Sequence, residues 1–253
     1  MAELEHILQY LEAYLELSDH PDSSTALNGL QVQGPAEVEH LVVAVDASEA
    51  SIRSAVERGA DLLLVHHGLF WGGLTPLTGQ LFRRVAPLIR SDVGLCSIHL
   101  PLDAHRDVGN CALLAEALGL EVQDSFADYD GVDIGWWGRL AEGVPAHELE
   151  GDLREVLGGP VHTIAGGPAK VRRVGVVTGA GAGFLSEAVE LGLDAFVTGE
   201  APHHAHFDAM ESGIHLFLGG HYATETFGVK ALAAHLADRF DLTWEFLDQP
   251  TGL

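Results

Sequence analysis

Two adjacent histidines, His66 and His67, follow four consecutive apolar residues in the stretch DLLLVHHGLF. Such an apolar run is typical of a buried strand, so both imidazoles are expected at the carboxyl end of that strand. A single histidine in this place is more often a packed residue that bonds to a backbone carbonyl. Two together indicate a site that uses two nitrogen lone pairs.

A second pattern, His-x-x-x-acid, occurs twice, each time just after an apolar run. SIHLPLD contains His99 and Asp103, and GGHYATE contains His221 and Glu225. In open α/β sheets ligands bind at the carboxyl ends of the strands, where loops can converge. Six nitrogen and oxygen donors suit two divalent ions roughly 3.5–4 Å apart with one carboxylate as a bridge. The six candidate ligands are His66, His67, His99, Asp103, His221 and Glu225.

The types of donor atom narrow the choice of metal ion but do not select one. Cys96 and Cys111 are the only cysteines, too few for a thiolate zinc site or a disulfide framework. Imidazole and carboxylate ligands leave Zn²⁺, Mn²⁺, Fe²⁺, Co²⁺ and Ni²⁺ open. Any one of these histidines could instead cap a strand, but the two matched pairs beside the double histidine favour a metal site.

The elements that position these residues form a pattern that occurs twice. The stretch GPAEVEHLVVAV from Gly34 aligns without a gap with GPAKVRRVGVVT from Gly167. Each copy reads as an apolar strand, a turn, a helix, a second and a third strand, and a final helix. We therefore predict an α/β protein of two similar lobes from an internal duplication, each a mixed sheet flanked by helices, with the metal site between the lobes. The first repeat spans 1–124 and the second 125–253.

Other segments complete this organisation. Apolar residues at helical spacing predict a helix over about residues 3 to 17. DSFADYDG is expected to connect the two repeats, before a glycine-rich strand and another helix. TGAGAG, from Thr178 to Gly183, lies between a strand and a helix. Its glycines could cradle a phosphate on backbone N–H groups or form a tight turn, and the sequence favours neither alternative.

The charge balance excludes several classes of partner. Thirteen lysines and arginines stand against 37 aspartates and glutamates, a formal net charge of −24. This field repels nucleic acids and anionic membranes, so neither is expected as a partner. No uncharged apolar run approaches the roughly 18 residues of a membrane span. The first residues lack the basic start and apolar run of a secretory signal, and a cytoplasmic location is expected.

The sequence resembles the Nif-three-like dinuclear-metal family, also called type 2 GTP cyclohydrolase homologues. The likeness covers essentially the whole chain and rests on NGLQV, ADLLLVHHGLFW, SIHLPLDAH, GWWGRL, TGE and GGHYATETFG. It implies two α/β lobes without the extra domain of longer members, and a homo-hexamer built as a trimer of dimers. It also implies two divalent ions per subunit, with Glu225 as the bridge. The residues that match the family's metal ligands are His66, His67, Asp103, His221 and Glu225.

The function expected from these residues is a metal-dependent hydrolase that acts on a nucleotide or another phosphoester. His99 is the candidate catalytic group for proton transfer, because imidazole titrates near neutral pH. The family's name implies GTP cyclohydrolase activity, although the sequence shows no base-recognition motif. The alternative is a non-enzymatic metal-binding, metal-storage or regulatory assembly.

Overall fold

The computed structural model describes residues 1–253, which form two compact units. Unit 1 comprises residues 1–102 and 228–249, and unit 2 comprises residues 103–227 and 250–253. The chain returns to unit 1 because its last strand, β13 (Thr243–Phe246), pairs with β4 (His40–Asp46). The predicted repeats, 1–124 and 125–253, describe sequence similarity, which these units do not test. The duplication therefore stays a prediction.

Unit 1 is built on a five-stranded sheet in the order β13-β4-β5-β6-β2. The first four strands run parallel and β2 pairs antiparallel with β6 at one edge. The runs LVVAV and LLLV are buried over almost their whole length, as expected for strands covered on both faces. The remaining strands of unit 1 are β5 (Leu62–His67), β6 (Gly94–Ser97), β2 (Gly29–Val32) and a separate pair, β1 (Ala2–Glu3) with β3 (Glu37–Val38).

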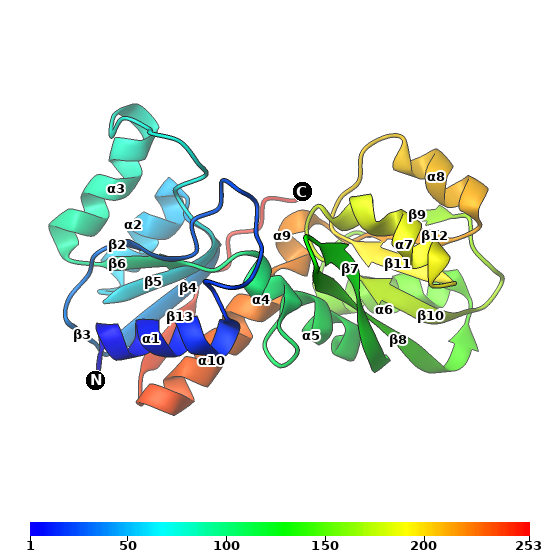
Figure 1. Cartoon of the computed structure of the whole chain (residues 1–253), viewed down its shortest axis with the longest axis horizontal. Helices are drawn as coiled ribbons and strands as arrows, with labels where there is room; N and C mark the ends of the chain where they lie inside the picture. Colours follow the sequence, from blue (N-terminus) through cyan, green and yellow to red (C-terminus); the bar gives the residue numbers. More distant parts are fainter. The chain divides into compact units, whose positions relative to one another are not determined.

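Helices cover both faces of this sheet (Figure 1). The helices α2 (Glu49–Glu57) and α3 (Gly79–Ser91) lie on one face, and α1 (Leu4–Leu15) and α10 (Thr226–Phe240) lie on the other. The predicted N-terminal helix is confirmed as α1, and its buried residues follow the helical spacing of the sequence: Leu4, Ile7, Leu11 and Leu15. A short helix, α4 (Leu100–Ala104), follows β6.

Unit 2 contains a six-stranded sheet in the order β7-β8-β10-β11-β12-β9. Its three consecutive strands β10, β11 and β12 are parallel, and the others pair antiparallel. The predicted mixed sheets flanked by helices are therefore confirmed within each unit. The strands are β7 (Glu121–Tyr129), β8 (Val132–Val144), β9 (His162–Ala165), β10 (Val171–Val176), β11 (Ala195–Thr198) and β12 (His215–Leu218).

The helices of unit 2 also lie on both faces of its sheet (Figure 1). One face packs against helices α5 and α6 through a core that includes Leu114, Leu149 and Phe217. The helices α7 and α8 lie on the other face. No helix of either unit is long and apolar enough to cross a bilayer. The helical segments are α5 (Asn110–Ala117), α6 (Ala146–Leu157), the 3₁₀ helix η1 (Gly181–Phe184), α7 (Leu185–Glu190), α8 (Ala205–Ser212) and α9 (His221–Thr224).

The segment DSFADYDG is a strand and hairpin turn, so its prediction as a connector is wrong. Residues 124–129 belong to β7, which pairs antiparallel with β8. The chain turns at Asp130 and Gly131, both with positive φ. The strand lies at the edge of the sheet, where its polar side chains can remain in water, and so it lacks the apolar run of a buried strand.

Candidate metal centre

Three of the candidate residues lie together in unit 1. One ring nitrogen from each of His66, His67 and His99 lies within 4.8 Å of the other two. The ring centroid of His66 is 4.6 Å from that of His67 and 5.1 Å from that of His99. His66 and His67 end β5, and His99 follows the neighbouring strand β6. The carboxyl ends of two adjacent parallel strands thus bring the three imidazoles together, as the sequence predicted.

Each of the three rings is oriented by an oxygen at its Nδ1 atom. Nδ1 of His66 lies 2.9 Å from the carbonyl oxygen of Ile98, and Nδ1 of His67 lies 2.9 Å from Oδ1 of Asp46. Nδ1 of His99 lies 2.7 Å from Oδ1 of Asp22. Carbonyl and ionised carboxylate oxygens can only accept, so the proton of each neutral ring is on Nδ1 and the lone pair is on Nε2. This is the usual arrangement around histidines that bind metal ions.

Two aspartates in this arrangement, Asp22 and Asp46, were missed by the sequence analysis. Asp46 had a detectable signal in the sequence, because it directly follows the apolar run LVVAV. In the structure it ends β4 and pairs in register with His67 on the adjacent strand. Asp22 had none, because it lies in an irregular loop far along the chain from His99. Its role depends on a long-range contact that no local pattern predicts.

The loop that follows the two histidines is held by side-chain hydrogen bonds. Oε1 of Gln31 accepts a hydrogen bond of 2.7 Å from the N–H of Leu69. The indole N–H of Trp71 donates to the carbonyl oxygen of Gly68 at 3.0 Å. The Trp71 ring then stands edge-on to His99, with centroids 5.0 Å apart and an angle of 88°. The sequence motif NGLQV thus contributes Gln31 to the loop beside the imidazole cluster.

The other three candidates lie together in unit 2. Asp103 and Glu225 are 5% and 3% exposed, and a carboxylate oxygen of each lies within 4.8 Å of the other. Oδ1 of Asp103 accepts hydrogen bonds from Nδ2 of Asn110 at 2.8 Å and from the hydroxyl of Thr178 at 3.0 Å. Two buried carboxylates at this separation repel each other, which a bound cation would relieve.

His221 lies between two carboxylates. Its Nε2 is 3.1 Å from Oε1 of Glu225, and its Nδ1 is 3.1 Å from Oε1 of Glu200. The hydrogen bond to Glu225 is the main reason that the pKa of His221 rises to about 9 from an ordinary 6.5; burial acts in the opposite direction, and Glu200 adds to the rise. In the metal-free protein the ring therefore carries a proton that a metal ion would have to displace.

This shift predicts how the stability of the metal-free protein depends on pH. A raised folded-state pKa means that protonated His221 stabilises the fold fully below about 6.5 and that this contribution is lost as the pH rises through about 9. We expect the unfolding free energy of chelator-treated wild type to fall between these values relative to a His221→Gln variant. Urea denaturation across this pH range measures the difference, and a constant difference would contradict the assignment.

The glycine loop TGAGAG is a tight turn beside these candidate ligands. The N–H of Gly179 donates to the hydroxyl of Thr224 at 3.1 Å, and the N–H of Gly181 donates to the hydroxyl of Thr198 at 3.0 Å. These two donors are therefore used within the protein, which favours the turn over the phosphate cradle. Gly179 has a φ of +61°, and a Cβ there would overlap Oε1 of Glu225. The glycine leaves room for the carboxylate.

The donors of the two units fit divalent metal ions of intermediate softness. Unit 1 supplies neutral imidazole nitrogens, and unit 2 supplies carboxylate oxygens with one imidazole. Both thiols are buried, and burial raises the pKa of Cys96 and Cys111 well above the ordinary range. They are therefore protonated at neutral pH and are not thiolate ligands. The donor set fits the metals predicted from the sequence but does not select one of them.

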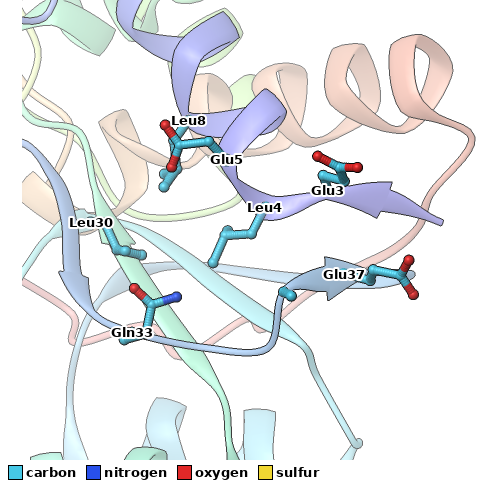
Figure 2. A pocket seen from close by; sticks show the side chains of 8 residues that line it. Glu3, Leu4, Glu5, Leu8, Leu30, Gln33 and Glu37 are labelled. Carbon is cyan, nitrogen blue, oxygen red and sulfur yellow. The ribbon is translucent and has the colours of Figure 1, made fainter.

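Other features of the molecule lie outside these clusters. Two exposed histidines, His203 and His206, pack against the ring of Phe207 on α8. Trp136 donates from its indole to the carbonyl oxygen of Ala104 at 2.9 Å and packs in the core of unit 2. A pocket of about 380 Å³ in unit 1 is lined mainly by leucine and glutamate side chains (Figure 2). None of the residues that line it is a candidate ligand.

Comparison with known proteins finds relatives that match this chain over most of its length. The Duf34/NIF3 (NGG1p interacting factor 3) family model matches residues 2–251. A protein of Deinococcus radiodurans, named GTP cyclohydrolase 1 type 2 homolog, is 42% identical over 249 residues, which cover 98% of this chain and 94% of that protein. A Halobacterium salinarum protein of the same name is 45% identical over 243 residues, covering 94% of this chain and 95% of that protein.

A solved structure is similar to this chain over nearly its whole length. The crystal structure of TTHA1606 from Thermus thermophilus is 42% identical in sequence, with a TM-score of 0.90 over 99% of this chain and 100% of that chain. The family match spans nearly the whole sequence, and these relatives are covered over most of their own length. The chain belongs to the Duf34/NIF3 family.

Proposed function

We propose that the protein is a metal-dependent hydrolase that acts on a nucleotide or another phosphoester through two divalent metal ions. The observation that carries this proposal is the cluster of His66, His67 and His99, three imidazoles whose Nδ1 atoms all bond to oxygen acceptors. Rings that only stabilised the fold would not need three converging nitrogens. Histidines oriented in this way are typical of a metal site, and His66 and His67 are proposed as ligands with His99 beside them.

The proposal assigns ligands in each of the two clusters. The imidazoles of unit 1 offer neutral nitrogen, and the carboxylates of unit 2 offer the negative charge that two divalent ions require. Within unit 2, carboxylate oxygens of Asp103 and Glu225 lie within 4.8 Å of each other, so both could hold the same ions. The residues that would hold the ions are His66, His67, Asp103, His221 and Glu225, and Glu225 would be the carboxylate that they share.

Two such ions, when bound, lower the pKa of a water molecule towards neutrality and polarise the phosphoryl or ring carbon under attack. His99 is assigned to proton transfer, because Asp22 leaves a lone pair on its Nε2 atom. Trp71 is 41% exposed beside His99 and offers an apolar surface at the edge of this cluster. The relatives' name makes GTP one of the substrates to test, alongside phosphodiesters and phosphomonoesters.

A double variant tests the proposal directly. The substitutions His67→Ala and Glu225→Ala remove one ligand from each unit, so hydrolysis by protein loaded with Mn²⁺ or Zn²⁺ should fall to background. General acid–base and metal effects together predict a loss of at least about 10³-fold. Initial rates on GTP and on a panel of phosphoesters measure it. Equal rates for wild type and the double variant would show that the activity does not come from this centre.

Exposed apolar residues support the predicted assembly of the chain into a homo-hexamer. Leu74 is fully exposed, and Leu77, Phe82 and Ile89 are about half exposed or more in the segment after the imidazole cluster. Large apolar side chains exposed to this extent are common in protein interfaces. We propose that a second copy of the chain covers these side chains.

A further inference from the structure

We propose that Asp22 is the positioning residue of His99, which it holds in a single tautomer and ring orientation so that Nε2 can accept a proton. The use of that lone pair in hydrolysis rests on the proposed function, whereas the positioning does not. Asp22 carries none of the sequence patterns that identify the metal ligands. The contacts around it distinguish it from an ordinary surface aspartate.

The hydrogen bond between the two residues fixes the location of the proton. Oδ1 of Asp22 lies 2.7 Å from Nδ1 of His99, a short distance for a bond of this type. An ionised carboxylate has no proton to donate, so Nδ1 of His99 is the donor. The Trp71 ring, edge-on at 5.0 Å between centroids, limits rotation of the imidazole on another side.

Asp22 is itself held by three further donors. Its Oδ2 accepts hydrogen bonds from Nδ2 of Asn28 at 2.8 Å and from the N–H of Leu100 at 3.1 Å. Its Oδ1 accepts from the N–H of Ser23 at 2.6 Å. Oδ1 of Asn28 in turn accepts from the backbone N–H of His99 at 2.8 Å. Asp22 and Asn28 therefore hold both the ring and the backbone of His99.

The aspartate remains charged in this environment. Its side chain is only 7% exposed, and burial, the largest single effect, acts to raise its pKa. The hydrogen bond and charge of His99, with the hydrogen bonds from Asn28 and Ser23, outweigh burial and lower the pKa of Asp22 below 3.8. The charged carboxylate can only accept hydrogen bonds, which keeps the proton of the neutral His99 ring on Nδ1.

The pair Asp46 and His67 provides a matched control. It has the same bond, 2.9 Å from Nδ1 to Oδ1, but Asp46 is 42% exposed and His67 is a proposed metal ligand. Coordination through Nε2 would keep the proton of His67 on Nδ1 even without its aspartate. A ring that is not coordinated, as proposed for His99, would depend on its aspartate alone.

Asparagine at position 22 is expected to reverse the tautomer of His99. Each oxygen of Asp22 accepts from two donors, so an asparagine must direct its NH₂ group at one of these pairs. The two backbone N–H groups can only donate, and Asn28 could accept only by a flip of its amide that would remove the acceptor of the His99 backbone N–H. The His99 ring can become an acceptor by moving its proton to the other nitrogen. The NH₂ group should therefore face His99, whose proton would move to Nε2 and remove the lone pair.

The test is ¹⁵N NMR of histidine-labelled full-length protein loaded with Zn²⁺, about two pH units above the ordinary imidazole pKa of about 6.5. A His99→Gln variant assigns the signal. We expect Nδ1–H in wild type, Nε2–H in Asp22→Asn, and unchanged Nδ1–H for His67 in Asp46→Asn. An Asp22→Ala variant, which should give mixed tautomers, replaces Asp22→Asn if the latter does not fold.

Two results would overturn the proposal: Nε2–H at His99 in wild type, or Nδ1–H retained in both Asp22 variants. If the chain takes up no Zn²⁺, the proposed function fails, but the same spectra of the metal-free protein still decide the role of Asp22. If hydrolysis is found, Asp22→Asn should lower kcat by about 10²- to 10⁴-fold with metal content and KM unchanged.

Discussion

Replacing Glu225 by glutamine is expected to weaken metal binding by more than about 100-fold, beyond the 10- to 100-fold typical of groups that only support a ligand. Glu225 and the neighbouring Asp103 are buried, at 3% and 5% exposed, and bound cations would neutralise both carboxylates. The substitution removes one of these two negative charges from the proposed site. Glutamine keeps the shape of the side chain but removes its charge. Elemental analysis and competition with a chelator would measure the loss.

Glu200→Gln is the matched control for this experiment. Glu200 contacts the same imidazole, that of His221, at the same distance of 3.1 Å, but its side chain is 53% exposed. Its loss should therefore weaken metal binding by no more than the 10- to 100-fold of a supporting group. If Glu225→Gln binds metal as tightly as Glu200→Gln does, Glu225 is not a bridging ligand.

Replacing Gly179 by alanine is expected to give the largest loss of stability among the glycine variants of this loop. Its φ of +61° costs an L-residue about 1–2 kcal/mol, and the new methyl group would overlap Oε1 of Glu225. Overpacking of this kind adds about 1–3 kcal/mol. The displaced carboxylate should also reduce metal content, so the variant would lose both properties together.

Gly183→Ala is the control that tests whether any glycine-to-alanine change in this segment has the same effect. Gly183 lies in the same loop, with an ordinary φ and no heavy atom within 4 Å of the position that the new methyl group would take. We expect its free energy of unfolding to stay within about 0.5 kcal/mol of wild type, with unchanged metal content. Urea denaturation and elemental analysis of both variants give the comparison, and equal losses in both would remove the argument from steric overlap.

The sequence predicted the buried strands and the residues at their ends because both depend on local patterns. The run before His66 and His67 is buried strand β5, and His99 follows β6 as expected. The strands that were missed, such as β2 and β7, lie at sheet edges, where an apolar face is not needed. Their positions are set by pairing with distant strands and not by their own composition.

The candidate site was predicted as a set of ligands without the groups that orient them. Candidate ligands can be recognised in a sequence by their residue type and their spacing. Asp22 has no such pattern, because it contacts His99 only when the loop before β2 is folded. Asn28 was visible in the NGLQV motif, but its role depends on bonds to Asp22 and to the backbone of His99. Such supporting contacts follow from tertiary structure, which a single sequence does not reveal.

The return of the chain to unit 1 has a consequence for its synthesis on the ribosome. Nearly all of unit 2 is one continuous stretch, 103–227, and can fold while translation continues. Unit 1 must wait for its last strand, β13, which completes the edge of the sheet at β4. A nascent polypeptide released a few codons too early would leave the β4 edge open to pairing with other molecules, and such truncated products should aggregate.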